Sequence, residues 1–447
     1  MKLGPFSALN KKSRLLSWLP ALLIVMVSLL ALLKPYLHSG FPYTHDGENH
    51  LARFANYKLA VKQKQIPPRF APNLMNRYGY PVLNYNYPLA NILSLFFSVF
   101  KINYELTFKL LAAGSFAAGG VGLWLWLKQL RVESKLAKAV GISMFYLAPF
   151  VVNLVYVRGN IGEIMAVNLF IWLGVVVESL VKNRWSRLKF TAAAVIGCSF
   201  LLSHNIAAVF GMGLMAVYAA ARLRQQPAKI KILGWWLAAS IGLSLWFWLP
   251  ALAEKHLITL DAVDITTNFA QHFPTLEQLL SSPLSFGFSY PTLVDTMSFA
   301  LGKPQLLVLV LAAVLPIMML VIAKRKIKQI DCLLLIGVWT LVLLQLQAAK
   351  PLWLLVPFAS YIQFPWRLSL FAVVLIAVWW GRAAAKLNSQ SWALWSVVIL
   401  LGLQWVSVWK FAPADFFHKR IRDYDAFTQS TTTMNENLPK SFSYDNI

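Results

Sequence analysis

Cysteine is almost absent from this chain, and the two cysteines present form no motif. Cys198 and Cys332 each lie within an apolar run, without a CxxC pair or a partner at a metal-binding spacing. A disulfide framework and a cysteine-based zinc site are therefore excluded. The sequence also lacks an internal repeat, which argues against a transporter built from two inverted halves.

Charged residues are scarce as well, and acidic residues are the scarcer kind. Only 13% of the residues are charged, with 17 Asp and Glu against 41 Lys and Arg, whereas 58% are hydrophobic. Uncharged apolar runs of about twenty residues, the length of a membrane-spanning helix, recur along the chain. The sequence therefore predicts an all-α polytopic membrane protein.

Much of the basic excess is confined to short segments between the apolar runs. Six such segments hold 22 of the 41 Lys and Arg, and the positive-inside rule assigns them to the cytoplasm. Fourteen of the 17 acidic residues then fall on the other side. The charge of +24 reflects topology, so nucleic acid is not expected as a partner. The six segments are residues 1–14, 128–138, 182–189, 222–231, 324–328 and 382–391.

About eleven apolar runs alternate between the two sides, which places the N-terminus in the cytoplasm and the C-terminus outside. Residues 15–33 read as a retained span, because Lys34 and Pro35 follow instead of a small-residue cleavage site. Residues 87–100 are too short to cross, so we expect a re-entrant or interfacial helix there. The predicted spans are residues 15–33, 105–127, 139–157, 162–181, 190–203, 206–221, 232–252, 304–323, 332–349, 367–385 and 392–410.

The long segments all fall on the outer side. A first loop at residues 34–104, with helices beside the membrane, and a second at 253–303 belong to a transmembrane module that we expect to cover residues 1–411. Residues 412–447 form an extracytoplasmic tail, and the polar composition of its last part, TQSTTTMNENLPKSFSYDNI at 428–447, predicts a poorly ordered end. Any chemistry is therefore expected at the outer surface.

The stretch THDGENHLARFANY, residues 44–57, brings opposite charges and imidazoles together in the first outer loop. Read as a helix with Asp46 at its N-cap, it places Asp46, His50, Arg53 and Tyr57 at steps of four, three and four, and hence on one face. Such a helix would lie along the membrane surface, with this polar edge as the floor of a site.

Asp46 has three possible roles. It could act as a general base or position a hydroxyl, with His50 and Arg53 one turn further on. It could instead be only an N-cap, with its neighbours as interfacial polar residues. Asp46, His45 and His50 could also ligate a divalent metal, but two His and one Asp are a weak signal, so we predict no cofactor.

Downstream, PPRFAPNLMNRYGYPVLNYNYP interleaves prolines with tyrosines. The prolines forbid a long helix, and the tyrosines, Tyr87 among them, offer flat apolar faces with a hydroxyl edge. Such faces suit stacking on a sugar ring, and they equally suit an aromatic belt at the lipid headgroups.

Further polar residues mark the outer ends of later spans. The turn YVRGNIGE carries Arg158 and Glu163 at the outer ends of two adjoining spans. An exposed arginine beside free backbone N–H groups suits a phosphate or pyrophosphate. Alternatively, an Arg158–Glu163 ion pair would only stabilise the hairpin that the two spans form. His204 in LLSHN, Glu254 in FWLPALAE and Arg367 in QFPWR occupy similar positions. If the spans bundle, these groups surround one outer cavity.

These pieces resemble the GT-C superfamily of membrane glycosyltransferases and, within it, bacterial integral membrane proteins labelled as related to 6-pyruvoyl-tetrahydropterin synthase. The resemblance rests on HDGENHLARF, GYPVLNYNYP, YVRGNIGE, LLSHN, FWLPALAE, FALGKPQL and QFPWR, in that order over residues 41–370.

The resemblance implies a GT-C-like bundle in the bacterial cytoplasmic membrane. It implies a transferase that moves a sugar from a polyprenyl-phosphate donor to a glycan, lipid or protein acceptor on the outer side, with inversion. Asp46 matches the acidic base of the first outer loop. We therefore expect Asp46 and His50 to be catalytic, with substrate bound by Arg53, Tyr57, Tyr87, Arg158, Glu163, His204, Glu254 and Arg367.

Two other classes stay open. A flippase or transporter of lipid-linked oligosaccharides predicts charged residues deep within several spans and broken helices near the midplane. A non-catalytic membrane scaffold predicts that Asp46 is dispensable.

Overall fold

The computed structural model describes residues 17–182, 185–263, 268–289, 296–307, 310, 328–356, 359–387, 392–432 and 434–442. Six helices in these ranges are long and apolar enough to cross a membrane, and two bent helix pairs raise the number to eight. The prediction of an all-α polytopic membrane protein is confirmed. The basic segment at residues 1–14 lies outside the described residues, as do most of the predicted span at 304–323 and of the basic segment at 324–328.

Four of the six long helices begin where the sequence supplies a proline or a side-chain cap. Pro20 and Pro227 lie in the first turns of α2 and α12, while the Asn103 and His204 side chains accept hydrogen bonds at the starts of α6 and α11. The helices are α2 (Leu19–Leu33), α6 (Tyr104–Gln129), α9 (Ile161–Lys182), α11 (Asn205–Leu223), α12 (Pro227–Ala253) and α18 (Ser369–Ala384).

Two further spans are bent at short breaks. The first joins α7 (Lys135–Tyr146) to α8 (Pro149–Asn153) and a π-helical turn (Leu154–Arg158) at 50°, because Pro149 lacks the N–H that would continue the helix. The second joins α16 (Gln329–Leu344) at 86° to η6 (Gln347–Ala349) and α17 (Lys350–Leu354). Two further helices, α10 (Arg187–Leu201) and α19 (Trp392–Lys410), are not among these eight candidate spans.

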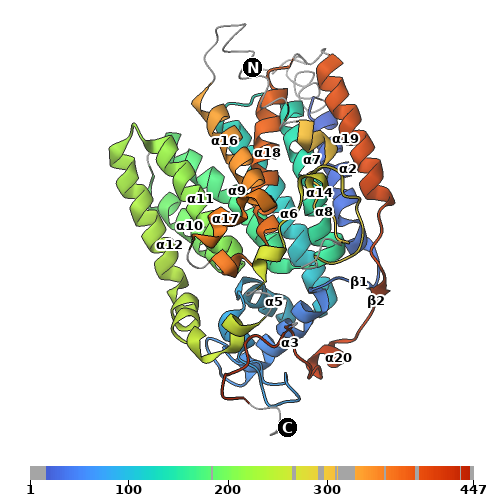
Figure 1. Ribbon diagram of the computed structural model, residues 1–447, viewed down its shortest axis with the longest axis vertical. Coiled ribbons are helices and arrows are strands. Elements are labelled where there is room, and N and C mark those ends of the chain that lie inside the picture. Colours follow the sequence, from blue (N-terminus) through green and yellow to red (C-terminus); the bar gives the residue numbers. More distant parts are fainter. Residues whose placement is uncertain are drawn as a thin grey trace, which may run out of the picture.

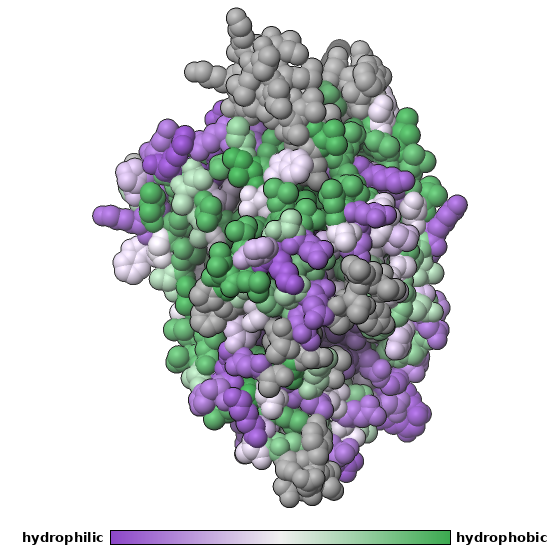
Figure 2. Space-filling model, in the orientation of Figure 1, coloured by the Kyte–Doolittle hydropathy of each residue, from purple (hydrophilic) through white to green (hydrophobic). Residues whose placement is uncertain are grey.

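Helices α9 and α18 form the centre of the bundle, against α6 and α7 (Figure 1). Almost every side chain of α18 is buried, and Gly141 of α7 packs so closely that a Cβ there would lie 2.8 Å from the carbonyl oxygen of Ala377. Helix α12 lies at the periphery and exposes Trp235 and Leu249 by 71% and 64%. Figure 2 shows apolar side chains over much of the middle and upper face, as expected for a lipid-facing surface.

The first loop forms one end of the bundle, shown at the bottom of Figure 1 and called here the loop end. Helix α3 (Gly47–Lys62) begins just after Asp46, as predicted, but both its polar and its apolar faces are buried. Helix α5 (Leu89–Val99) spans about 16 Å, roughly half of the hydrocarbon core, in keeping with the interfacial segment expected at residues 87–100. The first loop also holds η1 (Lys34–Leu37) and α4 (Val82–Tyr85). Smaller elements in the second loop and beyond are η3 (Lys255–Leu257), η4 (Thr259–Ala262), η5 (Phe269–Gln271), α14 (Leu276–Ser281), η7 (Ala359–Ile362) and η8 (Pro365–Leu368).

The tail wraps around the loop end. The prediction of a poorly ordered end at 428–447 is wrong for the described residues 428–432 and 434–442, because the Asn76 N–H donates to the Thr428 carbonyl at 2.9 Å and the Thr259 N–H donates to the Leu438 carbonyl at 3.0 Å. Strand β2 (Phe416–Phe417) pairs antiparallel with β1 (Phe41–Pro42), and α20 (Ile421–Asp425) packs on α3. The buried Glu105 carboxylate of α6 accepts hydrogen bonds from the Lys419 backbone N–H at 2.7 Å and from the Tyr424 hydroxyl at 3.0 Å. Contacts with partners distant in sequence therefore order a segment whose own composition does not.

We predict that Glu105→Ala loosens the tail by about 2 kcal/mol, because two hydrogen-bond donors lose a charged acceptor. The rate of limited proteolysis within residues 412–442 should rise in this variant. Glu133→Ala, which alters an exposed glutamate in the loop between α6 and α7, serves as the control. Equal cleavage rates in the two variants would show that Glu105 does not hold the tail.

Candidate active site

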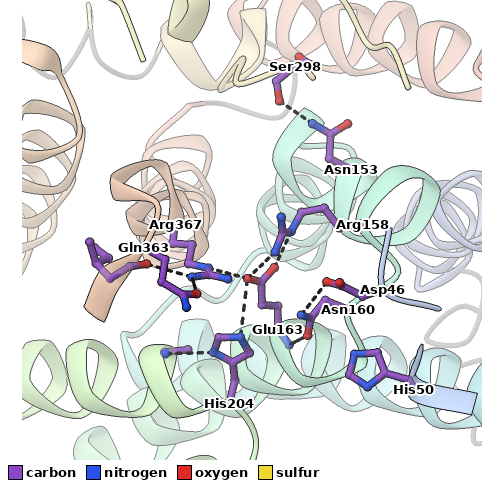
Figure 3. Close-up of polar contacts among 12 residues, drawn as sticks. Asp46, His50, Asn153, Arg158, Asn160, Glu163, His204, Ser298, Gln363 and Arg367 are labelled. Atoms are coloured by element: carbon purple, nitrogen blue, oxygen red, sulfur yellow. Dashed lines mark hydrogen bonds and ion pairs between the residues drawn. The ribbon is translucent and has the colours of Figure 1, made fainter. Parts of the chain in front are cut away.

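A buried carboxylate, Glu163 in the first turn of α9, lies at the centre of the polar groups at the loop end (Figure 3). Arg158 binds it through two parallel contacts, Nε to Oε2 at 2.7 Å and Nη2 to Oε1 at 2.8 Å. The Arg158 guanidinium also lies 4.8 Å from the ring centre of Trp366. Arg158 is 6% exposed, so the expectation of an exposed arginine is wrong, and the alternative of an Arg158–Glu163 pair is confirmed.

Arg367 brings a second guanidinium to the same carboxylate from the start of the α18 span. Its Nε lies 2.9 Å from Oε1 of Glu163, and its Nη1 donates to the Ile362 carbonyl and the Gln363 side chain. His204 approaches with Nε2 at 3.8 Å from Oε1, while its Nδ1 accepts the Ala207 N–H. Glu163 therefore joins the starts of three helical segments, and two arginines neutralise one buried charge.

Asn160 connects this ion cluster to Asp46. Its Oδ1 accepts from the Glu163 backbone N–H at 3.0 Å and from the Tyr87 hydroxyl at 2.9 Å, while its Nδ2 donates to Asp46 Oδ2 at 3.0 Å. Asp46 precedes α3 as expected, yet its side chain caps nothing. The N-cap alternative for the carboxylate is therefore wrong, and Asp46 Oδ1 accepts no hydrogen bond from any described residue.

The position of Asp46 follows from close backbone packing. The N–H groups of His45 and Asp46 donate to the carbonyls of Val157 and Arg158, both at 2.9 Å. Gly159 has φ +59°, and a Cβ at this position would lie 2.1 Å from Thr44 Oγ1. Only glycine lets the two segments approach so closely.

Two histidines near the cluster are held neutral. His50 Nε2 lies 3.3 Å from the Tyr87 oxygen; because the Tyr87 hydroxyl donates to Asn160, His50 must be the donor in this contact. Burial, assisted by the Arg53 guanidinium, holds the pKa of His50 well below its usual 6.5. His45 stacks on Phe288, and burial together with Arg158 lowers the pKa of His45 to about 4.

The remaining predicted residues lie elsewhere at the loop end. Arg53 is buried and donates to the side chain and the backbone carbonyl of Thr431 in the tail. Tyr57 belongs to a separate apolar cluster with Tyr80 and Leu83. Glu254 accepts from Asn84 at 2.9 Å and contacts none of the residues around Glu163.

Sequence reasoning missed Asn160, although a local signal marks it. Asn160 precedes α9, and Glu163 follows three residues later, the spacing of a helix-capping box. That spacing predicts the hydrogen bond to the Glu163 N–H but not the further bonds to Asp46 and Tyr87. Trp366 was also missed, because nothing local indicates that its ring lies over Arg158.

Metal ligation has little geometric support. Among the described residues, His, Cys, Asp and Glu form no group of three or more that could hold an ion. Asp46 Oδ2 and His50 Nε2 are both engaged in hydrogen bonds to other side chains.

Comparison with known proteins identifies the fold. No protein-family model and no curated protein matches the chain, so the narrower bacterial family of the sequence resemblance stays a prediction. Solved structures do match. The arabinofuranosyltransferase AftD from Mycobacteria is 16% identical over 88% of this chain and 26% of its own, with a TM-score of 0.53.

The oligosaccharyltransferase from Archaeoglobus fulgidus also resembles the chain. Its apo form is 10% identical over 95% of this chain and 61% of its own, with a TM-score of 0.51. The same organism's AglB, in complex with an inhibitory peptide and a dolichol-phosphate, is 12% identical over 97% and 62%, with a TM-score of 0.50. This chain thus spans about a quarter of the first enzyme and three fifths of the second. It has the GT-C fold of membrane glycosyltransferases.

We predict that stability falls as pH drops from about 6.5 to 4. His45 has a pKa near 6.5 in the unfolded chain and about 4 in the folded one, so in this window the unfolded state binds the extra proton. The loss is about 1 kcal/mol per pH unit.

Thermal unfolding midpoints at pH 7.5 and pH 5 test this prediction. His45→Phe keeps the contact with Phe288 but cannot titrate, so the difference between the two midpoints should shrink. An equal difference in the wild type and the variant would contradict the assignment.

Proposed function

We propose that this chain is an inverting glycosyltransferase that moves a sugar from a polyprenyl-phosphate donor to an acceptor at the outer surface of the bacterial cytoplasmic membrane. One observation carries the proposal. Asn160 and Glu163 connect the Asp46 carboxylate, which has one oxygen without a hydrogen-bond partner among the described residues, to the guanidinium groups of Arg158 and Arg367. A base and a binding site for a leaving phosphate are the two groups that this reaction needs.

Asp46 would be the general base. Its Oδ2 is fixed by Asn160, which leaves Oδ1 to accept the proton of an acceptor hydroxyl. The hydroxyl oxygen would attack the anomeric carbon as the bond from that carbon to the phosphate oxygen breaks, so that one displacement inverts the centre. His50 would act through Tyr87 and Asn160, and the geometry therefore favours a positioning role over the catalytic role expected from the sequence.

Arg158 and Arg367 would receive the leaving phosphate. Glu163 occupies Nε and Nη2 of Arg158 and Nε of Arg367, whereas Arg158 Nη1 and Arg367 Nη2 have no hydrogen-bond partner among the described residues. Glu163 would thus orient both guanidinium groups and lower the free-energy cost of burying them. The three groups together keep one positive charge, which suits a phosphate.

An apolar crevice beside Arg367 marks where the donor's lipid chain would lie. This narrow crevice between α11 and α18 is lined by Ile206, Phe210, Leu370 and Phe371 and reaches this arginine. The crevice has a volume of only about 10 Å³, so a prenyl chain could enter only if α11 and α18 moved apart; its phosphate would then lie near the guanidinium. The AglB structure, which holds a dolichol-phosphate on the same fold, supports a lipid-linked donor.

The transporter alternative has one observation in its favour, because two spans are broken, as it predicts. The buried charges, however, lie at span ends. Glu163 opens α9, while Glu178 near the other end of α9 pairs with Arg222 at 2.6 Å. A transport pathway would need charges near the midplane, so transfer chemistry is the better supported function.

We predict that Asp46→Asn lowers sugar transfer by about 10²- to 10⁴-fold, the usual contribution of a general base, while folding and lipid binding persist. Transfer of labelled sugar from polyprenyl-phosphate donors in reconstituted vesicles measures the effect. Glu277→Gln, which changes an exposed glutamate outside the cluster, is the matched control. Turnover at the wild-type rate in Asp46→Asn would remove Asp46 from the mechanism and favour the scaffold alternative.

A second prediction concerns the donor side. Arg158→Ala should weaken binding of a polyprenyl phosphate by about tenfold or more, because a buried charged contact is lost, and should weaken acceptor binding less. Titration of the purified protein with polyprenyl phosphate gives the affinity. Arg69→Ala removes an arginine that is 42% exposed and is the control. Equal losses of affinity for the donor and for the acceptor would assign Arg158 a purely structural role.

A further inference from the structure

A hollow of about 460 Å³ lies between the first turn of α3 and the tail, apart from the ion cluster around Glu163. Its lining residues come from α3 and from the tail that follows β2. The residues that matter here are Glu48, Asn49, Lys419, Phe427, Thr428 and Gln429.

The lining is polar but carries no net charge. Lys419 of the tail pairs with Glu48 of α3 across the hollow, so its two charges cancel. The side chains of Asn49, Thr428 and Gln429 make no hydrogen bond with any described residue, so amide and hydroxyl groups remain available. Phe427 adds a partly buried aromatic face. Neutral donors and acceptors beside an aromatic ring suit a sugar better than a phosphate or an acidic peptide.

The hollow is already formed and lies close to Asp46. Asn49 is three residues after Asp46, and side chains at this spacing on a helix lie about 5–6 Å apart at Cβ. The tail wall is fixed by the bonds of Glu105 and by the Asn76 N–H, which donates to the Thr428 carbonyl at 2.9 Å. A ligand would therefore meet a preformed site whose lining residue Asn49 lies about one helical turn from Asp46.

We propose that this hollow binds the acceptor and that the acceptor is a neutral glycan. This inference rests on the proposed function, because the hollow is assigned to the side of the reaction from which the hydroxyl comes. The sugar would bind Asn49 and Gln429 and place one hydroxyl toward Asp46. The tail thus supplies one half of the acceptor site and α3 the other.

Saturation-transfer NMR on the purified full chain tests this inference without requiring turnover. The probes are methyl glycosides of glucose, galactose, mannose and arabinose, with inorganic phosphate as the competing probe. The wild type should bind at least one glycoside, and the double variant Asn49→Ala, Gln429→Ala should bind it about tenfold more weakly. Gln63→Ala, which changes an exposed amide at the other end of α3, should bind like the wild type.

Asp46→Asn separates this inference from the proposed function. Glycoside binding that survives in Asp46→Asn while transfer is lost supports both proposals. Normal sugar transfer by Asp46→Asn would reject Asp46 as the base. Glycoside binding by the wild type and the double variant would then decide by itself whether the hollow is a sugar-binding site. Binding that is unchanged in the double variant, displacement by inorganic phosphate, or no binding of any glycoside by the wild type would each overturn the acceptor site.

Discussion

A single buried negative charge dictates the arrangement of the loop end. Glu163 is fully buried, and an isolated carboxylate at such a position would be very costly. Arg158 and Arg367 neutralise it, and each guanidinium is buried only because the carboxylate is present. The three side chains therefore form one unit that fixes the end of the bent α7–α8 span and the starts of α9 and α18 relative to one another.

The position of Asp46 depends on this unit. Asn160 lies between Arg158 and Glu163 in sequence, and its side chain bonds both to the Glu163 backbone and to Asp46. Gly159 lets the segment before α3 approach closely enough for these bonds. Two features that look separate in sequence, the acidic start of α3 and the later turn with Arg158 and Glu163, are thus one assembly.

Much of this fold follows from the sequence, because hydrophobic length and charge asymmetry are local properties. They predict most of the described spans and the start of α3 at Asp46. Long-range partners have no such signal. Arg53 looks equivalent to the other arginines, yet it contacts Thr431, 378 positions away, and Arg367 reaches Glu163 across 204 positions. The prediction of a poorly ordered end failed over the described part of 428–447 for the same reason, since Asn76 and Thr259, which bond to Thr428 and Leu438, are distant in sequence.

The free energy of unfolding of Glu163→Gln tests the central claim most directly. If Glu163 holds two buried guanidinium groups, its neutral variant leaves them uncompensated and loses about 3–5 kcal/mol relative to the wild type. Glu254→Gln, which changes a half-exposed carboxylate at the same end, should lose less than about 1 kcal/mol. Equal and small losses in the two variants would contradict the account, because the arginines would then not depend on Glu163.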